Sequence, residues 1–305
     1  MRNFVANAYN RALVRSQWNI GIVNHPIDLF LDPKLRPRIH WLPPLTNGRF
    51  VADPFGVHKN GRLYVFCEDF DYGAHKGQIS VIEVEGGNAS EPQEVINLPV
   101  HMSYPYIIEY GGKILCIPET YEAGEVALYE SEDFPRSWSK VATLITGFRA
   151  LDSTVFYHDG LWWLMCTNQD IGPHDTLFLW YATEVLGPWI PHPKNPVKKD
   201  RSSTRPAGTP FQHNRRLYRP AQDCSRYYGE RIAINRVDRL TPSEFHEETV
   251  AWVGPFLDSP YPHGAHTISK VGEMTLIDGK RHKFIKKAFT SAIVRNLRRI
   301  ACGCS

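Results

Sequence analysis

The sequence predicts an all-β fold, a five-bladed β-propeller, and three observations lead to this prediction. Five stretches of the 305-residue chain share one shape, an apolar run, a turn and a second apolar run. Little helical spacing separates these stretches, and hairpins repeated at such a period are typical of propeller blades. Successive turns are 51, 48, 55 and 57 residues apart, at Gly61, Gly112, Gly160, Arg215 and Gly272.

Each repeat is expected to supply the inner strands of one blade. The hairpins occupy residues 53–68, 104–119, 152–167, 207–222 and 264–278. A third strand is predicted at 77–84, 125–129, 176–181 and 231–237, and a fourth at 138–145, 189–191 and 249–253. The fourth strands are rich in Trp and β-branched residues, which favour sheets.

The fifth repeat has no outer strands after it. We expect them at the other end of the chain, in residues 18–23 and 39–42, so that N-terminal strands close the ring. Closure protects sheet edges that would otherwise pair with other chains. We therefore predict a single propeller domain over residues 1–282.

A basic amphipathic helix and tail are predicted for residues 283–305. Apolar residues recur at three- and four-residue spacing from Phe284 to Ile300, with lysines and arginines between them. Such a helix either packs on the propeller or contacts an anionic membrane surface or a partner enzyme. The sequence leaves these alternatives open.

Composition narrows the function classes. The 35 basic and 32 acidic residues leave a net charge of +3, which gives no general case for nucleic acid. No apolar run approaches the roughly 18 residues that span a bilayer, and residues 1–17 lack the apolar core of a signal peptide. Six scattered cysteines do not form a disulfide scaffold. We expect a cytoplasmic protein, with peripheral membrane contact through the basic helix left open.

Candidate site residues follow from the fold. Innermost strands line the axis of a propeller, so residues at their starts converge. These positions hold Asp53, Tyr104, Asp152 and Ala207, with His266 near the start of the fifth. Two carboxylates from alternate blades therefore face one space. Glycosidic bond cleavage needs such a pair, which in inverting enzymes lies roughly 6.5 to 9.5 Å apart.

The motifs Ala52-Asp53-Pro54-Phe55 and Leu151-Asp152-Ser153-Thr154-Val155-Phe156 resemble the five-bladed propeller glycosidases of the arabinanase, xylosidase and invertase group. In that group an Asp on the first blade is the base or nucleophile. A second Asp, about a hundred residues later, tunes acidity and binds sugar hydroxyls. Here 99 residues separate Asp53 from Asp152. The resemblance therefore implies these two roles for them.

Further motifs occur from Trp18 to about Gly279: Trp18-Asn19-Ile20-Gly21-Ile22, Ser103-Tyr104-Pro105, Pro118-Glu119-Thr120, Arg205-Pro206-Ala207-Gly208, Arg219-Pro220-Ala221-Gln222-Asp223, Tyr228-Gly229 and His266-Thr267. With them the chain resembles the N-terminal domains of glucosamine inositolphosphorylceramide transferases. In the plant transferase the glycosyltransferase fold lies in a separate C-terminal domain. The resemblance thus implies the fold more strongly than it implies catalysis.

The proton donor is an open question at this point. The propeller glycosidases carry their acid, a Glu, roughly at residues 205–208 of this chain, where no carboxylate stands. Glu119 or Glu68, at the inner ends of return strands, could take the role, as could His266. The catalytic candidates are Asp53, Asp152, Glu119 and His266.

The predicted ligand is anionic. Arg205 and Arg219 suit a carboxylate or phosphate, which a guanidinium grips with two parallel hydrogen bonds. This prediction requires both to point into the channel, and the alternative is that loop carboxylates hold them. No metal ligand or cofactor is assigned, although His266 could bind a channel cation. The predicted substrate-binding residues are Tyr104, Arg205, Arg219, Gln222, Asp223, Tyr228 and Glu68.

Two functions remain open. The protein is a glycoside hydrolase or glycosyltransferase acting on a glycan or glycolipid, or a non-catalytic module that positions an acceptor for a partner glycosyltransferase. A second acidic group within roughly 10 Å of Asp53 would favour the first. A channel filled by aromatic side chains would argue against both.

Overall fold

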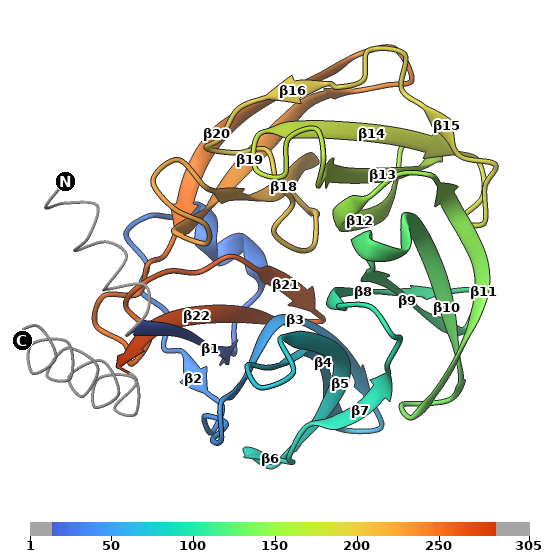
Figure 1. The fold of residues 1–305 in the computed structure, drawn as a ribbon. Coiled ribbons are helices and arrows are strands. Elements are labelled where there is room, and N and C mark those ends of the chain that lie inside the picture. Colours follow the sequence, from blue (N-terminus) through green and yellow to red (C-terminus); the bar gives the residue numbers. More distant parts are fainter. Residues whose placement is uncertain (1–13, 285–305) are drawn as a thin grey trace, which may run out of the picture.

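The computed structural model describes residues 14–284 and confirms the five-bladed β-propeller. Five antiparallel sheets surround one axis in chain order (Figure 1). The first blade consists of β3 (Arg49–Lys59), β4 (Arg62–Asp71), β5 (Lys76–Glu85), β6 (Asn88–Ala89) and β7 (Gln93–Ile96), and the second of β8 (Ser103–Tyr110), β9 (Lys113–Glu119), β10 (Glu125–Asp133) and β11 (Ser137–Thr146). The third blade consists of β12 (Ala150–His158), β13 (Leu161–Asn168), β14 (Thr176–Ala182), β15 (Ile190–Pro191) and β16 (Lys198–Lys199). The fourth consists of β17 (Phe211–His213), β18 (Arg216–Asp223), β19 (Arg231–Leu240) and β20 (Phe245–Val253).

The fifth blade joins the two ends of the described chain. Its inner strands are β21 (Ile268–Val271) and β22 (Met274–Phe284), and its outer strands are β1 (Val14–Val23) and β2 (His40–Trp41). β1 runs antiparallel to β22, from Val14 opposite Phe284 to Val23 opposite Thr275. The predicted closure of the ring by N-terminal strands is confirmed.

Tight turns explain the repeat that is visible in the sequence. The turn residues Asn60 and Gly61 both have positive φ, 53° and 76°, and Asp159 and Gly160 have 48° and 82°. Two residues of positive φ match the right-handed twist of a hairpin, and Asn, Asp and Gly adopt that conformation most easily. The spacing of the turns is therefore the spacing of the blades.

Two details of the strands differ from the prediction. The first blade has short outer strands, β6 and β7, that the sequence pattern did not indicate. In the fourth blade the inner strand starts only at Phe211, because Gly208 forms a parallel bridge to Ile268 of the fifth blade. Gly208 has a φ of 124°, and an added Cβ would lie 1.7 Å from the Ile268 carbonyl oxygen.

Apolar side chains fill the space between neighbouring blades. Leu115, Trp162 and Trp180 belong to a cluster that joins the second and third blades. Cys67, Cys116 and Cys166 are buried thiols, as expected for small core residues. The blades are thus held by burial of apolar surface, which leaves the axis free for polar groups.

Helices are minor in the described range. Between residues 14 and 284 they are two short 3₁₀ segments, η1 (Ile27–Leu31) and η2 (Tyr121–Ala123). No helix in this range is long and apolar enough to cross a bilayer. The helix predicted for 283–305 lies outside the described residues, except that Lys283 and Phe284 end β22.

Candidate functional site

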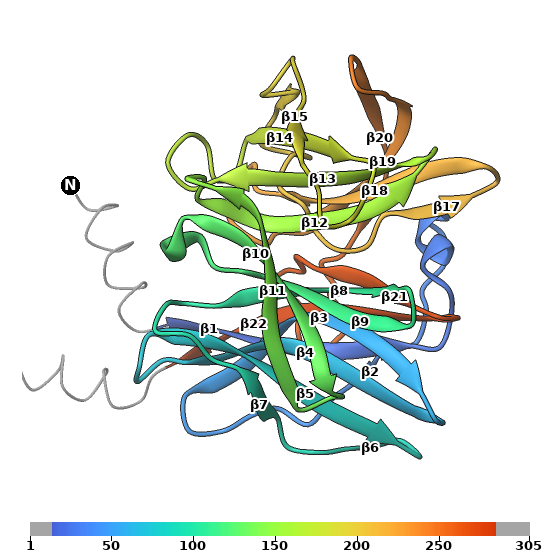
Figure 2. The same cartoon turned by 90° about the vertical axis from the view of Figure 1, so that its right-hand side faces the viewer.

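A β-bulge interrupts the inner strand of each of the first three blades at the same place. Asp53, Tyr104 and Asp152 have φ values of 52°, 44° and 53°, and the strand register shifts at each of them. Such a conformation costs a non-glycine residue of order 1 to 3 kcal/mol and is concentrated at functional sites. The arrowheads of β3 and β12 point to the same face (Figure 2). The bulges adjoin one another, because the Tyr104 N–H lies 3.3 Å from Asp53 Oδ2 and the Tyr104 hydroxyl lies 2.8 Å from Thr154 beside Asp152.

Polar side chains from all five blades meet beside these bulges. We call them the central cluster, and each is less than a tenth exposed. Buried polar groups in such numbers need hydrogen-bond or charge partners, and the partners here come mostly from one another. The central cluster consists of Asp53 and Glu68, Glu119, Asp152, Arg205 and Gln222, and His266 and Asp278.

Asp152 is held from three sides. Arg205 donates to both of its carboxylate oxygens, from Nε at 2.6 Å and from Nη2 at 3.3 Å. Gln222 Nε2 donates to Oδ2 at 2.7 Å, while the Asp152 N–H donates to Glu119 at 2.9 Å. Ser103 supplies a further hydrogen bond to Glu119. Arg205 is therefore engaged by Asp152, with Glu119 also 3.7 Å away.

The Asp53 carboxylate has fewer side-chain hydrogen-bond donors than the Asp152 carboxylate. The Thr267 hydroxyl donates to its Oδ1 at 2.6 Å, and the Tyr104 N–H lies 3.3 Å from Oδ2. His266 Nε2 is 3.7 Å from Oδ1. Burial raises the pKa of Asp53 to about 6, against the lowering effect of His266. A carboxyl with a pKa near neutrality is suited to general base catalysis.

Asp278 is a member of the site that the sequence analysis missed. Its Oδ1 accepts the backbone N–H groups of His266 and Thr267 at 2.8 and 3.1 Å, and His266 Nδ1 contacts its other oxygen. Trp18 stacks on the imidazole with ring centroids 3.9 Å apart. The repeat predicts this position, because Asp278 ends the fifth hairpin just as Glu68 and Glu119 end the first and second.

We expect the change Asp278→Asn to lower the pKa of His266. Burial alone would lower this pKa, but Asp278 and then Asp53 raise it above its usual value. The stability that the protonated imidazole contributes is present below the unfolded pKa and is lost as pH rises through the folded one. Histidine titration by NMR would measure the change, and an unaltered pKa in the variant would contradict the assignment.

Asp53, His266 and Asp278 also form a candidate cation site. Ligand atoms of the three lie within 4.8 Å of one another, and all three residues are buried. An imidazole binds a metal ion only in its neutral form. The two carboxylates favour a proton on His266, so a cation would have to compete with that proton.

Tyr104 is not available to a substrate, contrary to the prediction. It is fully buried, accepts the Gly208 N–H at 2.6 Å and lies 2.8 Å from the Thr154 hydroxyl. Its ring packs on Phe55. Phe55, Thr154 and Gly208 follow Asp53, Asp152 and Arg205 in the sequence of their respective blades.

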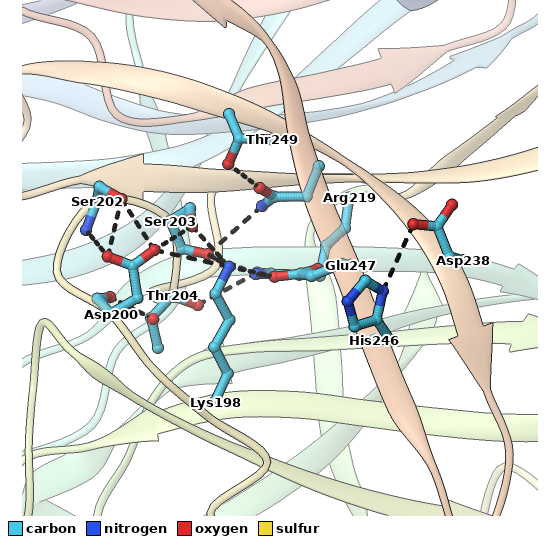
Figure 3. Close-up of polar contacts among 11 residues, drawn as sticks. Lys198, Asp200, Ser202, Ser203, Thr204, Arg219, Asp238, His246, Glu247 and Thr249 are labelled. Atoms are coloured by element: carbon cyan, nitrogen blue, oxygen red, sulfur yellow. Dashed lines mark hydrogen bonds and ion pairs between the residues drawn. The ribbon is translucent and has the colours of Figure 1, made fainter.

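Arg219 and Asp223 do not join the central cluster, which corrects two predicted substrate-binding residues. Arg219 is 1% exposed and forms a bidentate pair with Glu247, while Lys198 donates to the same carboxylate (Figure 3). Asp223 pairs with Arg231 at 2.9 Å. Both side chains already have their partners.

Tyr228 and Glu68 lie at the edge of the site. Tyr228 is 40% exposed, and its ring lies 5.1 Å from the Arg205 guanidinium and edge-on to His266. The Glu68 side chain keeps 10% of its exposure. Burial and then the charge of Asp53 raise the pKa of Glu68 well above its usual value. Both predicted residues thus keep exposed surface beside the central cluster.

The sequence pattern of one family, described as the N-terminal part of glucosamine inositolphosphorylceramide transferase 1, matches residues 45–255. The transferase of that name from Arabidopsis thaliana is 33% identical over 208 residues, which cover 66% of this chain and 27% of the relative. The one from Oryza sativa subsp. japonica is 31% identical over 274 residues, covering 82% and 36%. This chain spans about a third of the length of these relatives.

Solved structures share the fold. Zg3597, a family 117 glycoside hydrolase from Zobellia galactanivorans, matches with a TM-score of 0.54 at 15% identity, over 82% of this chain and 78% of its own. The GH43 protein BlXynB from Bacillus licheniformis matches with a TM-score of 0.52 at 14% identity, over 71% and 48%. At these identities the likeness concerns the propeller architecture alone.

Proposed function

Because this chain belongs to the family of the glucosamine inositolphosphorylceramide transferase 1 N-terminal domain, we propose that its central cluster binds a sugar and makes or breaks a glycosyl bond in glycolipid or polysaccharide assembly. The observation that carries the proposal is the convergence of carboxyl groups from four blades beside the strained bulges of the inner strands. Structural needs alone do not call for so many buried acids, which are costly unless paired.

The environments of the carboxyls assign their roles. Asp53, with a pKa of about 6, removes the proton from the attacking hydroxyl. Asp152 is fixed by Arg205 and Gln222, so it binds sugar hydroxyls and sets the local charge without transferring a proton. Glu119 orients the Asp152 backbone and Arg205. Gln222 Oε1 is buried without a donor among residues 14–284, and a sugar hydroxyl or amine would satisfy it.

The charge of the central cluster favours a neutral or cationic ligand over the predicted anionic one. That prediction required Arg205 and Arg219 to be free, but Asp152 engages the first and Glu247 the second. Five carboxyl groups remain beside one guanidinium and one imidazole. Burial raises the pKa of Glu68 and Glu119 well above its usual value, so these two are neutral, and the remaining groups offer no excess of positive charge to a phosphate or a uronic acid. The site suits neutral hydroxyls or a protonated amine. An amino sugar, such as the glucosamine in the name of the relatives, fits this charge.

The second candidate function is recognition without catalysis. The fourth blade has Arg205 roughly where the propeller glycosidases carry their acid, and Arg205 holds Asp152 in an ion pair. A module of this kind would hold an acceptor sugar for a partner glycosyltransferase. It would use the same central cluster, so turnover separates the two functions.

A thermal-shift screen tests the proposal. We expect glucosamine and neutral sugars to raise the melting temperature of the wild type by mass action, while glucuronic acid and glucose 6-phosphate leave it unchanged. The shift should shrink in Gln222→Leu, whereas in Arg219→Lys, changed outside the central cluster, it should persist. A shift with the anionic sugars alone would contradict the proposed charge preference, and no shift with any sugar would contradict sugar binding.

A further inference from the structure

Glu68 differs from the other glutamate of the central cluster in its partners. Both Glu119 oxygens are engaged, Oε1 by the Ser103 hydroxyl and Oε2 by the Asp152 N–H. Glu68 accepts no hydrogen bond from residues 14–284, although it is 7% exposed. A buried carboxyl without donors is more stable protonated than ionised. Burial raises the pKa of both glutamates well above its usual value, but only the Glu68 carboxyl has oxygens that no hydrogen-bond donor occupies.

His101, in the connection between the first and second blades, is oriented toward Glu68. The Gly77 N–H donates to its Nδ1 at 3.0 Å, which requires a lone pair there and places the ring proton on Nε2. Nε2 lies 3.6 Å from Glu68 Oε1. Burial lowers the pKa of His101, so the ring is neutral and presents an N–H to the carboxyl.

Gly77 makes this arrangement sterically possible. A Cβ added there would lie 2.7 Å from Glu68 Oε1 and 2.5 Å from the Met102 carbonyl oxygen. The Met102 N–H also donates to the Gly77 carbonyl at 3.0 Å. Two backbone groups of one glycine thus hold residues 101 and 102, in the connection to the second blade, against the carboxyl of the first.

We propose that Glu68 is the acid that protonates the leaving oxygen of the glycosyl bond and that His101 is its positioning residue. The inference rests on the proposed function. The Glu68 proton passes to the leaving oxygen as the C1–O bond breaks, while Asp53 takes the proton of the attacking hydroxyl as the new bond to C1 forms. Proton exchange with solvent then restores both groups. Glu68 replaces the acid that the fourth blade lacks.

His101 prepares the carboxyl for each cycle. Its Nε2–H stabilises the ionised Glu68 that is formed after proton transfer. The same N–H opposes the four surrounding acids, which raise the pKa of Glu68. Those acids are Asp53, Glu119, Asp152 and Asp278. Loss of the imidazole N–H should therefore raise the pKa of Glu68 further.

The kinetic test uses phenyl, 4-nitrophenyl and 2,4-dinitrophenyl glucosaminides of both anomers. For Glu68→Gln we expect the rate on the phenyl glycoside to fall at least about 100-fold and the rate on the dinitrophenyl glycoside to persist, because that leaving group needs no proton. Asp53→Asn should slow all three. Equal rates of Glu68→Gln and wild type on every glycoside would overturn the role of Glu68 and leave the proposed function standing. A wild type inactive on all of them would overturn catalysis itself.

A second measurement isolates His101 without a substrate. NMR of protein labelled with ¹³C-carboxyl glutamate follows the Glu68 resonance, identified by its absence in Glu68→Gln. In His101→Asn this resonance should titrate at higher pH than in the wild type, and in the control His158→Asn, at the end of β12, it should not move. An unchanged titration in His101→Asn would overturn the positioning role.

Discussion

Replacing Arg219 by methionine is expected to lower the free energy of unfolding by about 3 to 5 kcal/mol. The guanidinium donates to both oxygens of Glu247 and to the carbonyl oxygens of Ser203 and Thr204, and both charged side chains are 1% exposed. Burial alone would raise the pKa of Glu247, yet Arg219 and Lys198 hold it below its usual value. Removing Arg219 leaves a buried carboxylate with Lys198 as its remaining cation.

Chemical denaturation at neutral pH measures this loss. The double variant Arg219→Met with Glu247→Leu is the matched control, and it should recover much of the stability because no unpaired charge is left behind. A loss below about 1 kcal/mol in the single variant would show that the pair is only loosely formed, as exposed ion pairs are. Arg219 would then again be available to an anionic ligand.

The position of Arg219 shows where sequence reasoning failed. Arg219, Gln222 and Asp223 are all predicted to bind substrate, yet they lie on β18, where side chains alternate between two faces. Gln222 points into the central cluster, whereas Arg219 and Asp223 share the other face and pair with Glu247 and Arg231. Counting by two along the strand would have separated them.

The fold could be predicted because its information is local. Turn residues such as Asn60-Gly61 and Asp159-Gly160 adopt the positive φ that a tight hairpin needs. Their spacing in the sequence therefore gives the spacing of the blades. The partners of the site residues are not local. Arg205 meets Asp152 across 53 residues, and Thr267 meets Asp53 across 214. Such pairs depend on how the blades are packed, which no short motif encodes.

Replacing Asp53 by asparagine is expected to stabilise the protein at pH 8 relative to pH 4 and to abolish turnover. Burial raises the pKa of Asp53 from 3.8 to about 6. The stability of the protonated carboxyl is present below the unfolded pKa and is lost as pH rises through 6, whereas asparagine does not titrate. The difference between variant and wild type should therefore grow by as much as roughly 3 kcal/mol between these pH values.

Denaturation curves of both proteins at pH 4 and pH 8 give the stability difference, and the glucosaminide assay gives the rate. A side chain that destabilises the fold at working pH and is essential to turnover is retained for function, because stability alone would select its replacement. Loss of stability in Asp53→Asn at both pH values would instead mark Asp53 as a structural acceptor for Thr267 and Tyr104. Retained turnover would move the base to another carboxyl, of which Asp152 is tied to Arg205 and Asp278 to His266. The rate of Asp53→Asn relative to wild type thus decides whether Asp53 is the base, and a wild type without turnover would leave the central cluster to bind its sugar without reacting.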